Sequence, residues 1–148
     1  MSNIADSFKK MLFNELGKPY IYGANGPNEF DCSGLVLWYL KNAGILPRKI
    51  DLSAESLYMY LVNNHLAIQY DSHQHVKLGD IIFYKNIVGV IDHVGIATDE
   101  MFVINAAGGD STTTTLDAAI KKQACVRLNL FDYRPIYSIV SPKYRFLI

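Results

Sequence analysis

The sequence predicts an α+β fold, and three observations support that prediction. Helical hydrophobic patterns occupy the first third of the chain and strand patterns the rest, which is the order typical of α+β folds. Of the 148 residues, 50% are hydrophobic and 19% are charged, a composition typical of a folded domain with its own core. No repeat, linker or Pro/Gly-rich break divides the chain, so residues 1–148 are expected to form a single domain.

Three helices are expected in the first third of the chain. The first is expected to end at Gly17 and carries four hydrophobic residues at helical spacing: Phe8, Met11, Leu12 and Leu16. The second begins near Cys32, with Asp31 or Ser33 as its N-cap. Ser53 is expected to cap the third, because a serine hydroxyl can accept a hydrogen bond from a free N–H group of the first turn.

Five strands are expected after these helices. The run Ile81–Tyr84 is hydrophobic throughout, which is typical of a strand buried on both faces. Residues 93–97 and 101–105 alternate between the two faces of a sheet, and two further strands are expected within residues 124–128 and 137–140. The polar run Ser111–Thr115 is expected to be a surface loop or an exposed strand.

The two alternating strands can be aligned with each other from the sequence. A tight turn centred on Asp99 would place Ile96 opposite Phe102 and so pair hydrophobic side chains. The same register puts His93 directly opposite Asn105 on the other face of the sheet. The pattern therefore predicts a His–Asn pair across a hairpin, with Cβ atoms about 4.5–5.5 Å apart.

Three of these residues form a candidate catalytic constellation. Cys32 lies in the first turn of a helix, where the helix dipole and unpaired N–H groups favour a thiolate and can lower a cysteine pKa to about 3.5–7.5. His93 can take up the thiol proton, and the side-chain amide of Asn105 can hold the imidazole in one tautomer and orientation. A nucleophile, a base and an orienting group of these types are typical of cysteine enzymes that transfer acyl groups.

Charge and hydropathy argue against several other classes of function. The 14 basic and 14 acidic side chains cancel, so the composition gives no reason to expect a nucleic-acid or anionic-membrane partner. No hydrophobic run approaches the roughly 20 residues of a membrane-spanning helix, and Met1–Leu16 shows no secretory signal. Two cysteines do not make a disulfide framework. His73 and His75 have no evident third ligand, so neither a metal nor another cofactor is expected.

Four segments of the sequence resemble successive motifs of the NlpC family of cell-wall cysteine peptidases: Pro19–Gly23, Asp31–Val36, Gly79–Phe83 and His93–Ile96. Their order and separations match the family, and the resemblance extends from about Met11 to Gly108. It implies a papain-like α+β fold, with the nucleophile at the N-terminus of a helix packed on an antiparallel sheet of about five strands. It also implies that residues 1–148 are a single NlpC-type catalytic domain.

The resemblance further implies roles for four residues. Cys32 matches the nucleophile and His93 the base. Asn105 lies twelve positions after the histidine, where the family has its third polar residue and more commonly a second histidine. Tyr20 matches a tyrosine twelve positions before the nucleophile, which helps to bind the oxyanion together with the Cys32 backbone N–H.

The implied activity is hydrolysis of amide bonds in peptidoglycan stem peptides, such as the bond between D-glutamate and a diamino acid. The family occurs in exported bacterial enzymes, phage tail and lysis proteins, and secreted toxins. In the absence of a recognisable export signal, we expect synthesis in the cytoplasm and delivery to the cell wall by a phage tail or other delivery partner, through a virion or another export route. Two alternatives stay open: a papain-like acyltransferase or transpeptidase, and a non-catalytic structural or binding module of a tail or wall assembly.

Overall fold

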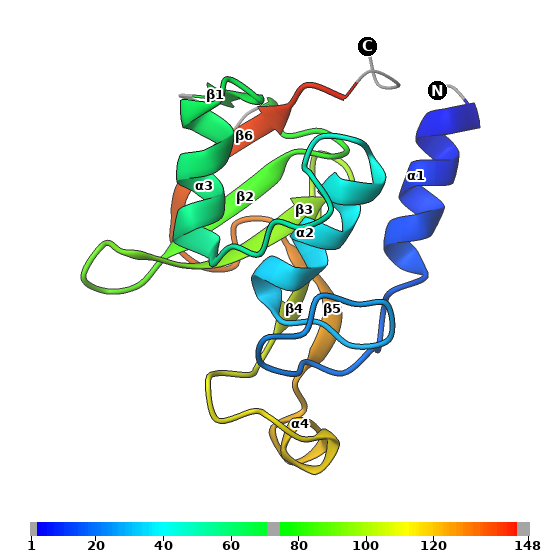
Figure 1. Cartoon of the computed structure of the whole chain (residues 1–148), viewed down its shortest axis with the longest axis vertical. Coiled ribbons are helices and arrows are strands. Elements are labelled where there is room, and N and C mark those ends of the chain that lie inside the picture. The colour runs from blue at the N-terminus through cyan, green and yellow to red at the C-terminus, as the bar shows by residue number, and fades with distance from the viewer. Residues whose placement is uncertain (1–2, 71–74, 145–148) are drawn as a thin grey trace.

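The computed structural model describes residues 3–70 and 75–144 (Figure 1). Within these ranges it has four helices: α1 (Asn3–Phe13), α2 (Cys32–Asn42), α3 (Ala54–Asn63) and α4 (Leu116–Lys122). Six strands form one sheet: β1 (Ala67–Tyr70), β2 (Ile81–Lys85), β3 (Ile91–Ala97), β4 (Phe102–Ala107), β5 (Cys125–Leu130) and β6 (Ile136–Pro142). Their order is β1-β6-β2-β3-β4-β5, and neighbouring strands are antiparallel. The predicted α+β, papain-like class is confirmed.

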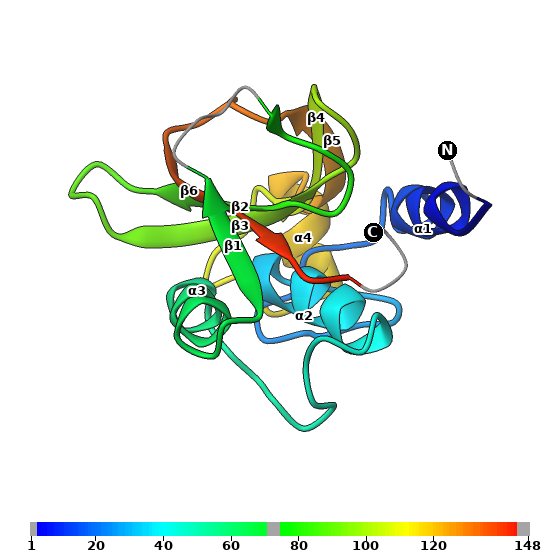
Figure 2. The ribbon, with the colours of Figure 1, turned by 90° about the horizontal axis from the view of Figure 1, so that it is seen from above.

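Two helices cover one face of the sheet. Figure 2 shows α2 and α3 together below the strands, while α4 lies beyond the ends of β4 and β5 and α1 stands to one side (Figures 1 and 2). Phe8 of α1 contacts Tyr39 of α2 edge-on, with ring centroids 6.1 Å apart. The main core lies between the helices and the sheet, where Leu35 of α2 and Val94 of β3 are fully buried.

The opposite face of the sheet has a smaller core of its own. It contains six buried residues, and most of them come from the strands: Val76, Ile82, Tyr84, Ala97, Val103 and Ile139. Phe131 and Tyr70 pack against its edge. The centre of the sheet is therefore covered on both faces, which confirms the prediction that Ile81–Tyr84 form a strand buried on both sides.

The first helix is shorter than the sequence pattern predicts. It ends at Phe13, and the chain continues through turns to Gly17. The reason is tertiary: the Gly17 N–H donates to the carbonyl of Val126 in β5, at 2.8 Å, which draws the backbone out of the helix. Leu16 is consequently 38% exposed and is not part of a buried helical stripe.

Two elements of the structure are missing from the sequence-based prediction, namely β1 and α4. β1 has only four residues and pairs with β6 at the edge of the sheet, so the predicted five strands become six. α4 spans seven residues and exposes Leu116 and Ile120, so it carries little hydrophobic periodicity. The polar run Ser111–Thr115 is a loop rather than a strand, and Thr115 ends it as the N-cap of α4.

The register predicted for the β3–β4 hairpin is wrong by two residues. Ile96 pairs with Ile104, not with Phe102, because the turn is centred one residue later than Asp99. The Asp99 carboxylate sets this turn by accepting hydrogen bonds from the N–H groups of Met101 and Phe102, at 2.8 and 2.9 Å. A shift of two residues leaves every side chain on its predicted face.

The corrected register gives one glycine a structural role. It places Gly95, rather than His93, opposite Asn105, so the predicted direct His–Asn pairing becomes a diagonal one. A Cβ atom at Gly95 would lie 2.9 Å from the Cβ of Asn105, closer than two such atoms normally approach. The missing side chain at Gly95 therefore leaves Asn105 room beside β3.

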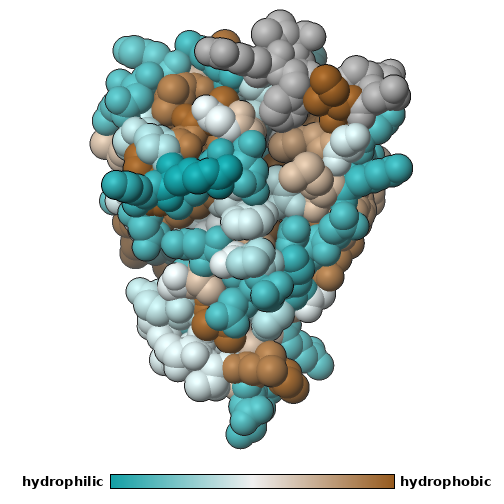
Figure 3. Space-filling model, turned by 45° about the vertical axis from the view of Figure 1, so that its right-hand side comes forward, coloured by the Kyte–Doolittle hydropathy of each residue, from teal (hydrophilic) through white to brown (hydrophobic). Residues whose placement is uncertain are grey.

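Hydrophobic and hydrophilic side chains lie intermixed on the face shown in Figure 3. In the described part of the chain, no helix combines the length and the hydrophobicity needed to cross a membrane.

The close packing of α2 leads to a stability prediction. A Cβ at Gly34 would lie 2.0 Å from the backbone oxygen of Ala24. We expect Gly34→Ala to lower the free energy of unfolding by about 2 kcal/mol, because this overlap outweighs the roughly 1 kcal/mol that alanine gains in helix propensity. Urea denaturation measures the change, with Lys41→Ala near the other end of α2 as control. Equal denaturation midpoints for the two variants would contradict the packing argument.

Candidate active site

An open cleft of about 780 Å³ lies beside the N-terminus of α2. Its walls come from the loop before α2, the start of α3, the segment after β4 and the turn after β5. Three of the four predicted site residues line it: Tyr20, Cys32 and His93. The fourth, Asn105, is fully buried and contacts His93. Pockets of roughly 300–1,000 Å³ are typical of ligand sites, so the cleft has room for a short peptide.

Asp31 holds the first turn of α2 in place. Its Oδ1 accepts hydrogen bonds from the Gly34 N–H at 2.7 Å and the Ser33 hydroxyl at 3.2 Å, so Asp31, of the two predicted candidates, is the N-cap. Its Oδ2 accepts from the Gly23 N–H at 2.8 Å. One carboxylate thus ties the loop before α2 to the turn that begins with Cys32.

His93 forms the predicted contact with Asn105. Its Nε2 lies 2.6 Å from Asn105 Oδ1. The Asn105 amide nitrogen donates to the backbone oxygen of Arg127, at 3.3 Å, and to the side-chain oxygen of Asn129, at 3.0 Å. A backbone carbonyl can only accept, which assigns the amide orientation and makes Asn105 Oδ1 the acceptor of the His93 Nε2–H. In the neutral ring Nδ1 is then the basic nitrogen.

A β-bulge precedes His93. Tyr84 pairs with His93 and Lys85 with Ile91, so Asp92 is an extra residue on β3. The His93 ring packs against that of Tyr84, with centroids 5.5 Å apart. Bulges often redirect side chains beside active sites, and this one lies at the edge of the cleft.

The structure favours neutral forms of Cys32 and His93. Burial, assisted by the Asp31 carboxylate, raises the pKa of the Cys32 thiol to about 12, although N–H groups of Ser33 and Val94 hydrogen bond to the sulfur and oppose this rise. Burial lowers the pKa of His93 to about 4. The thiolate expected from the helix N-terminus is therefore not favoured in the free protein, because desolvation outweighs the helix dipole. The contact with the Val94 N–H nevertheless places the sulfur next to the strand that carries His93.

Tyr20 lies in the same cleft as Cys32 and is 7% exposed. Burial, together with the neighbouring Cys32 and Asp31, raises the pKa of its phenol, which therefore stays protonated and available as a donor. Gly109 lies directly against the ring, since a Cβ there would be 2.2 Å from Tyr20 Cδ1. The Tyr20 N–H also donates to the backbone oxygen of Ala124, at 3.0 Å.

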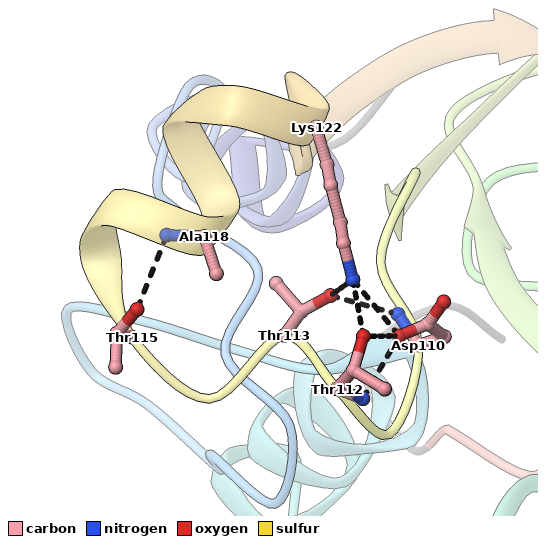
Figure 4. Close-up of polar contacts among 6 residues, drawn as sticks. All are labelled: Asp110, Thr112, Thr113, Thr115, Ala118 and Lys122. Atoms are coloured by element: carbon pink, nitrogen blue, oxygen red, sulfur yellow. Dashed lines mark hydrogen bonds and ion pairs between the residues drawn. The ribbon is translucent and has the colours of Figure 1, made fainter.

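The cleft wall that follows Gly109 is anchored by a lysine from α4 (Figure 4). Lys122 Nζ lies 3.0 Å from Asp110 Oδ1, 2.5 Å from Thr112 Oγ1 and 3.0 Å from Thr113 Oγ1. The hydrogen bond from the Thr112 hydroxyl and the neighbouring Lys122 hold the pKa of the Asp110 carboxyl well below its usual range. A helix that the sequence pattern does not reveal thus holds one wall of the site.

The cleft-lining residues that sequence reasoning missed include two arginines and a tyrosine: Arg127, Tyr133 and Arg134. Arg134 forms an ion pair with Asp92, at 2.7 Å, and Arg127 donates to the backbone oxygens of Gln123 and Ala107. No motif marks any of them, because they lie between about 95 and 102 residues after Cys32 and reach the site only through the sheet topology.

The predicted absence of a metal site can be examined only in part. His73 lies outside the described residues, and His75 is exposed. Within residues 3–70 and 75–144, no three His, Cys, Asp or Glu side chains are grouped so that they could hold a metal ion.

Residues 17–129 match the model of the NlpC/P60 family. The probable endopeptidase YafL of Escherichia coli (strain K12) is 31% identical to the chain over 119 residues, which cover 75% of this chain and 43% of YafL. The murein DD-endopeptidase MepH of the same organism is 33% identical over 87 residues, 57% of this chain and 30% of MepH. The chain thus spans less than half the length of these curated relatives.

Among solved structures, the fold is similar to that of the NlpC/p60 domain of the peptidoglycan hydrolase SagA. The TM-score is 0.60 at 18% identity, and the match covers 93% of this chain and 97% of that domain. At 18% identity, this structural similarity is evidence for the fold alone.

Burial of neutral His93 makes stability depend on pH. Between about pH 6.5 and 4, the unfolded chain binds a proton at His93 that the native protein does not bind, so stability falls as the pH falls through this window. The loss amounts to about 3 kcal/mol by pH 4. Denaturation at a series of pH values should show this slope in the wild type and a flatter one in His93→Gln, which cannot titrate. Parallel curves for the two proteins would show that residue 93 is not buried in its neutral form.

Proposed function

Since the chain belongs to the NlpC/P60 family of cysteine peptidases, we propose that it is an endopeptidase that hydrolyses amide bonds in peptidoglycan stem peptides. One observation supports this most directly. Cys32 and His93 line one cleft. The Nε2–H of the His93 ring donates a hydrogen bond to Asn105 Oδ1, so Nδ1 is the ring nitrogen left to act as the base. This is the set of groups that acyl transfer through a thioester requires.

The reaction begins with both partners neutral. As Cys32 Sγ attacks the scissile carbonyl carbon, His93 Nδ1 takes the thiol proton, and a C–S bond forms while the carbonyl becomes an oxyanion. The imidazolium keeps its Nε2–H bonded to Asn105 Oδ1, an acceptor already in place. Because the proton moves as the C–S bond forms, the mechanism does not need a resting thiolate.

Two donors can stabilise the oxyanion. The Cys32 N–H is at the first position of α2, where helical N–H groups have no partner within the helix. The protonated Tyr20 phenol lines the same cleft and supplies the second donor. Collapse of the intermediate breaks the C–N bond as His93 gives its proton to the leaving amine. A water molecule, deprotonated by His93, then hydrolyses the thioester.

The specific bond proposed is the one between D-glutamate and the diamino acid of the stem peptide. Delivery by a phage tail or another export route stays a prediction from the family resemblance. That residues 1–148 form one catalytic domain is likewise a prediction. Transfer of the acyl group to an amine instead of water would proceed through the same thioester, so the product has to be identified chemically.

Digestion of purified peptidoglycan and of defined stem peptides, read by mass spectrometry, tests the proposed activity. We expect a new free carboxylate on D-glutamate and a new amine on the diamino acid. The same digestion with an added amine acceptor separates hydrolysis from acyl transfer, since transfer would give an amide product. If neither substrate is cut under any of these conditions, the proposal is wrong.

Replacement of the nucleophile gives the sharpest mutational test. Cys32→Ser should reduce cleavage by at least about 10³-fold, because a serine hydroxyl is a far weaker nucleophile at this position. Cys125→Ser is the matched control, since Cys125 is the other free thiol and does not line the cleft. An active Cys32→Ser variant would assign the activity to another group.

Asn105 should matter less than Cys32. Asn105→Ala removes the acceptor for His93 Nε2–H, and we expect a fall in kcat of up to about 10²-fold with a small change in KM. Asn105→His restores the residue more common in the family and should recover part of the rate with a shifted pH profile. Steady-state kinetics at several pH values measures both, and an unchanged kcat for Asn105→Ala would exclude an orienting role.

A further inference from the structure

Tyr133 contacts both partners of the hydrogen bond that orients the His93 imidazole. It lies in the turn after β5, forty residues beyond His93 in the sequence. Its hydroxyl oxygen is 2.7 Å from Asn105 Oδ1 and 3.2 Å from His93 Nε2. The three polar atoms therefore lie within hydrogen-bond distance of one another, and Tyr133 is the member of the three to which the sequence analysis gave no role.

The hydrogen-bond directions within this group follow from its chemistry. The Asn105 amide nitrogen is already committed to Arg127 and Asn129, so Oδ1 is the atom that faces His93 and Tyr133. A carbonyl oxygen has two lone pairs, and here it has two donors: the His93 Nε2–H and the Tyr133 hydroxyl. Burial raises the pKa of the Tyr133 phenol, which keeps that donor protonated.

The ring of Tyr133 is held in place by its neighbours. It packs edge-to-face on Tyr84, with centroids 5.5 Å apart, and Tyr84 in turn packs on His93. The Tyr84 hydroxyl donates to the backbone oxygen of Phe131 at 2.7 Å, which fixes the turn that carries Tyr133. Tyr133 lines the cleft and is 39% exposed, whereas Asn105 is fully buried, so Tyr133 reaches from the cleft surface to the buried His93–Asn105 hydrogen bond.

We propose that Tyr133 is a positioning residue for the imidazole of His93. Its hydroxyl fills the second lone pair of Asn105 Oδ1 and so, together with the two hydrogen bonds of the amide nitrogen, holds that oxygen against His93 Nε2. Its ring keeps cleft water away from the Nε2–H···Oδ1 bond. The consequence for His93 is a single tautomer, with the proton on Nε2 and the lone pair of Nδ1 available to the thiol. This inference rests on the proposed function only for its effect on rate, because the tautomer itself can be observed without substrate.

The test compares Tyr133→Phe with the wild type and with Tyr137→Phe. Tyr137 is a suitable control, since it lies on β6, is 48% exposed and packs on Tyr58, and it does not line the cleft. Nitrogen NMR of the His93 ring reports the tautomer directly. We expect one tautomer in the wild type and in Tyr137→Phe, and an admixture of the Nδ1–H tautomer in Tyr133→Phe, because the Asn105 side chain is then held only through its amide nitrogen and its Oδ1 is free to move away from Nε2.

Kinetics on peptidoglycan stem peptides provide the second measurement. Tyr133→Phe should lower kcat about 3- to 10-fold with little change in KM, the size expected for one lost hydrogen bond. Tyr133→Ala also removes the ring and admits water, so it should lower kcat further and move the pKa of His93 upward toward its usual value. Thermal unfolding of each variant verifies that the fold is kept.

The two measurements separate failure of this inference from failure of the proposed function. A His93 ring with the same single tautomer in wild type and in folded Tyr133→Phe overturns the role of Tyr133, whatever the activity. A tautomer mixture in Tyr133→Phe supports that role even if the wild type cuts no stem peptide, in which case only the proposed substrate is wrong.

Discussion

The burial of α2 is the constraint on which the rest of the structure depends. Most of its residues are inaccessible to water, from Ser33 and Gly34 in the first turn to Leu40 in the last. Each fully buried Leu or Val side chain contributes about 1.5–3 kcal/mol, so this helix supplies a large share of the stability of the domain. A helix enclosed in this way cannot slide or rotate without opening the core, and Cys32 at its first position is therefore held against β3.

That burial also determines the electrostatics of the site. The first turn of a helix usually favours a thiolate, yet here the surrounding protein excludes water and the capping Asp31 carboxylate adds negative charge. The same exclusion of water keeps His93 neutral. Cys32 and His93 are thus both neutral in the free protein.

The remaining parts of the site act by restricting motion. Asp31 ties the loop before α2 to the helix, Lys122 anchors the wall at Asp110 through side-chain oxygens (Figure 4), and Asn105 fixes the imidazole from behind. None of these three contacts needs to touch a substrate. Together they fix the loop before α2, the imidazole and one cleft wall before anything binds, and under the proposed mechanism this reduces the reorganisation that the reaction requires.

The sequence by itself determined the local features. A cap at Asp31 or Ser33, a cap at Ser53 and the burial of β2 on both faces were predictable, because capping and periodicity depend on residues close together in the chain. That Cys32, His93 and Tyr20 share a cleft was predictable only from the order of the family motifs. The face of Asn105 was also predictable, since a strand alternates with a period of two. Tertiary structure decided what depends on contacts between distant segments. It ends α1 early, because Gly17 hydrogen bonds to β5, and it adds the edge strand β1. It also brings Tyr133 to the His93–Asn105 pair and sets the direction of the pKa shifts of Cys32 and His93. These features follow from burial and long-range pairing, which a local pattern does not encode.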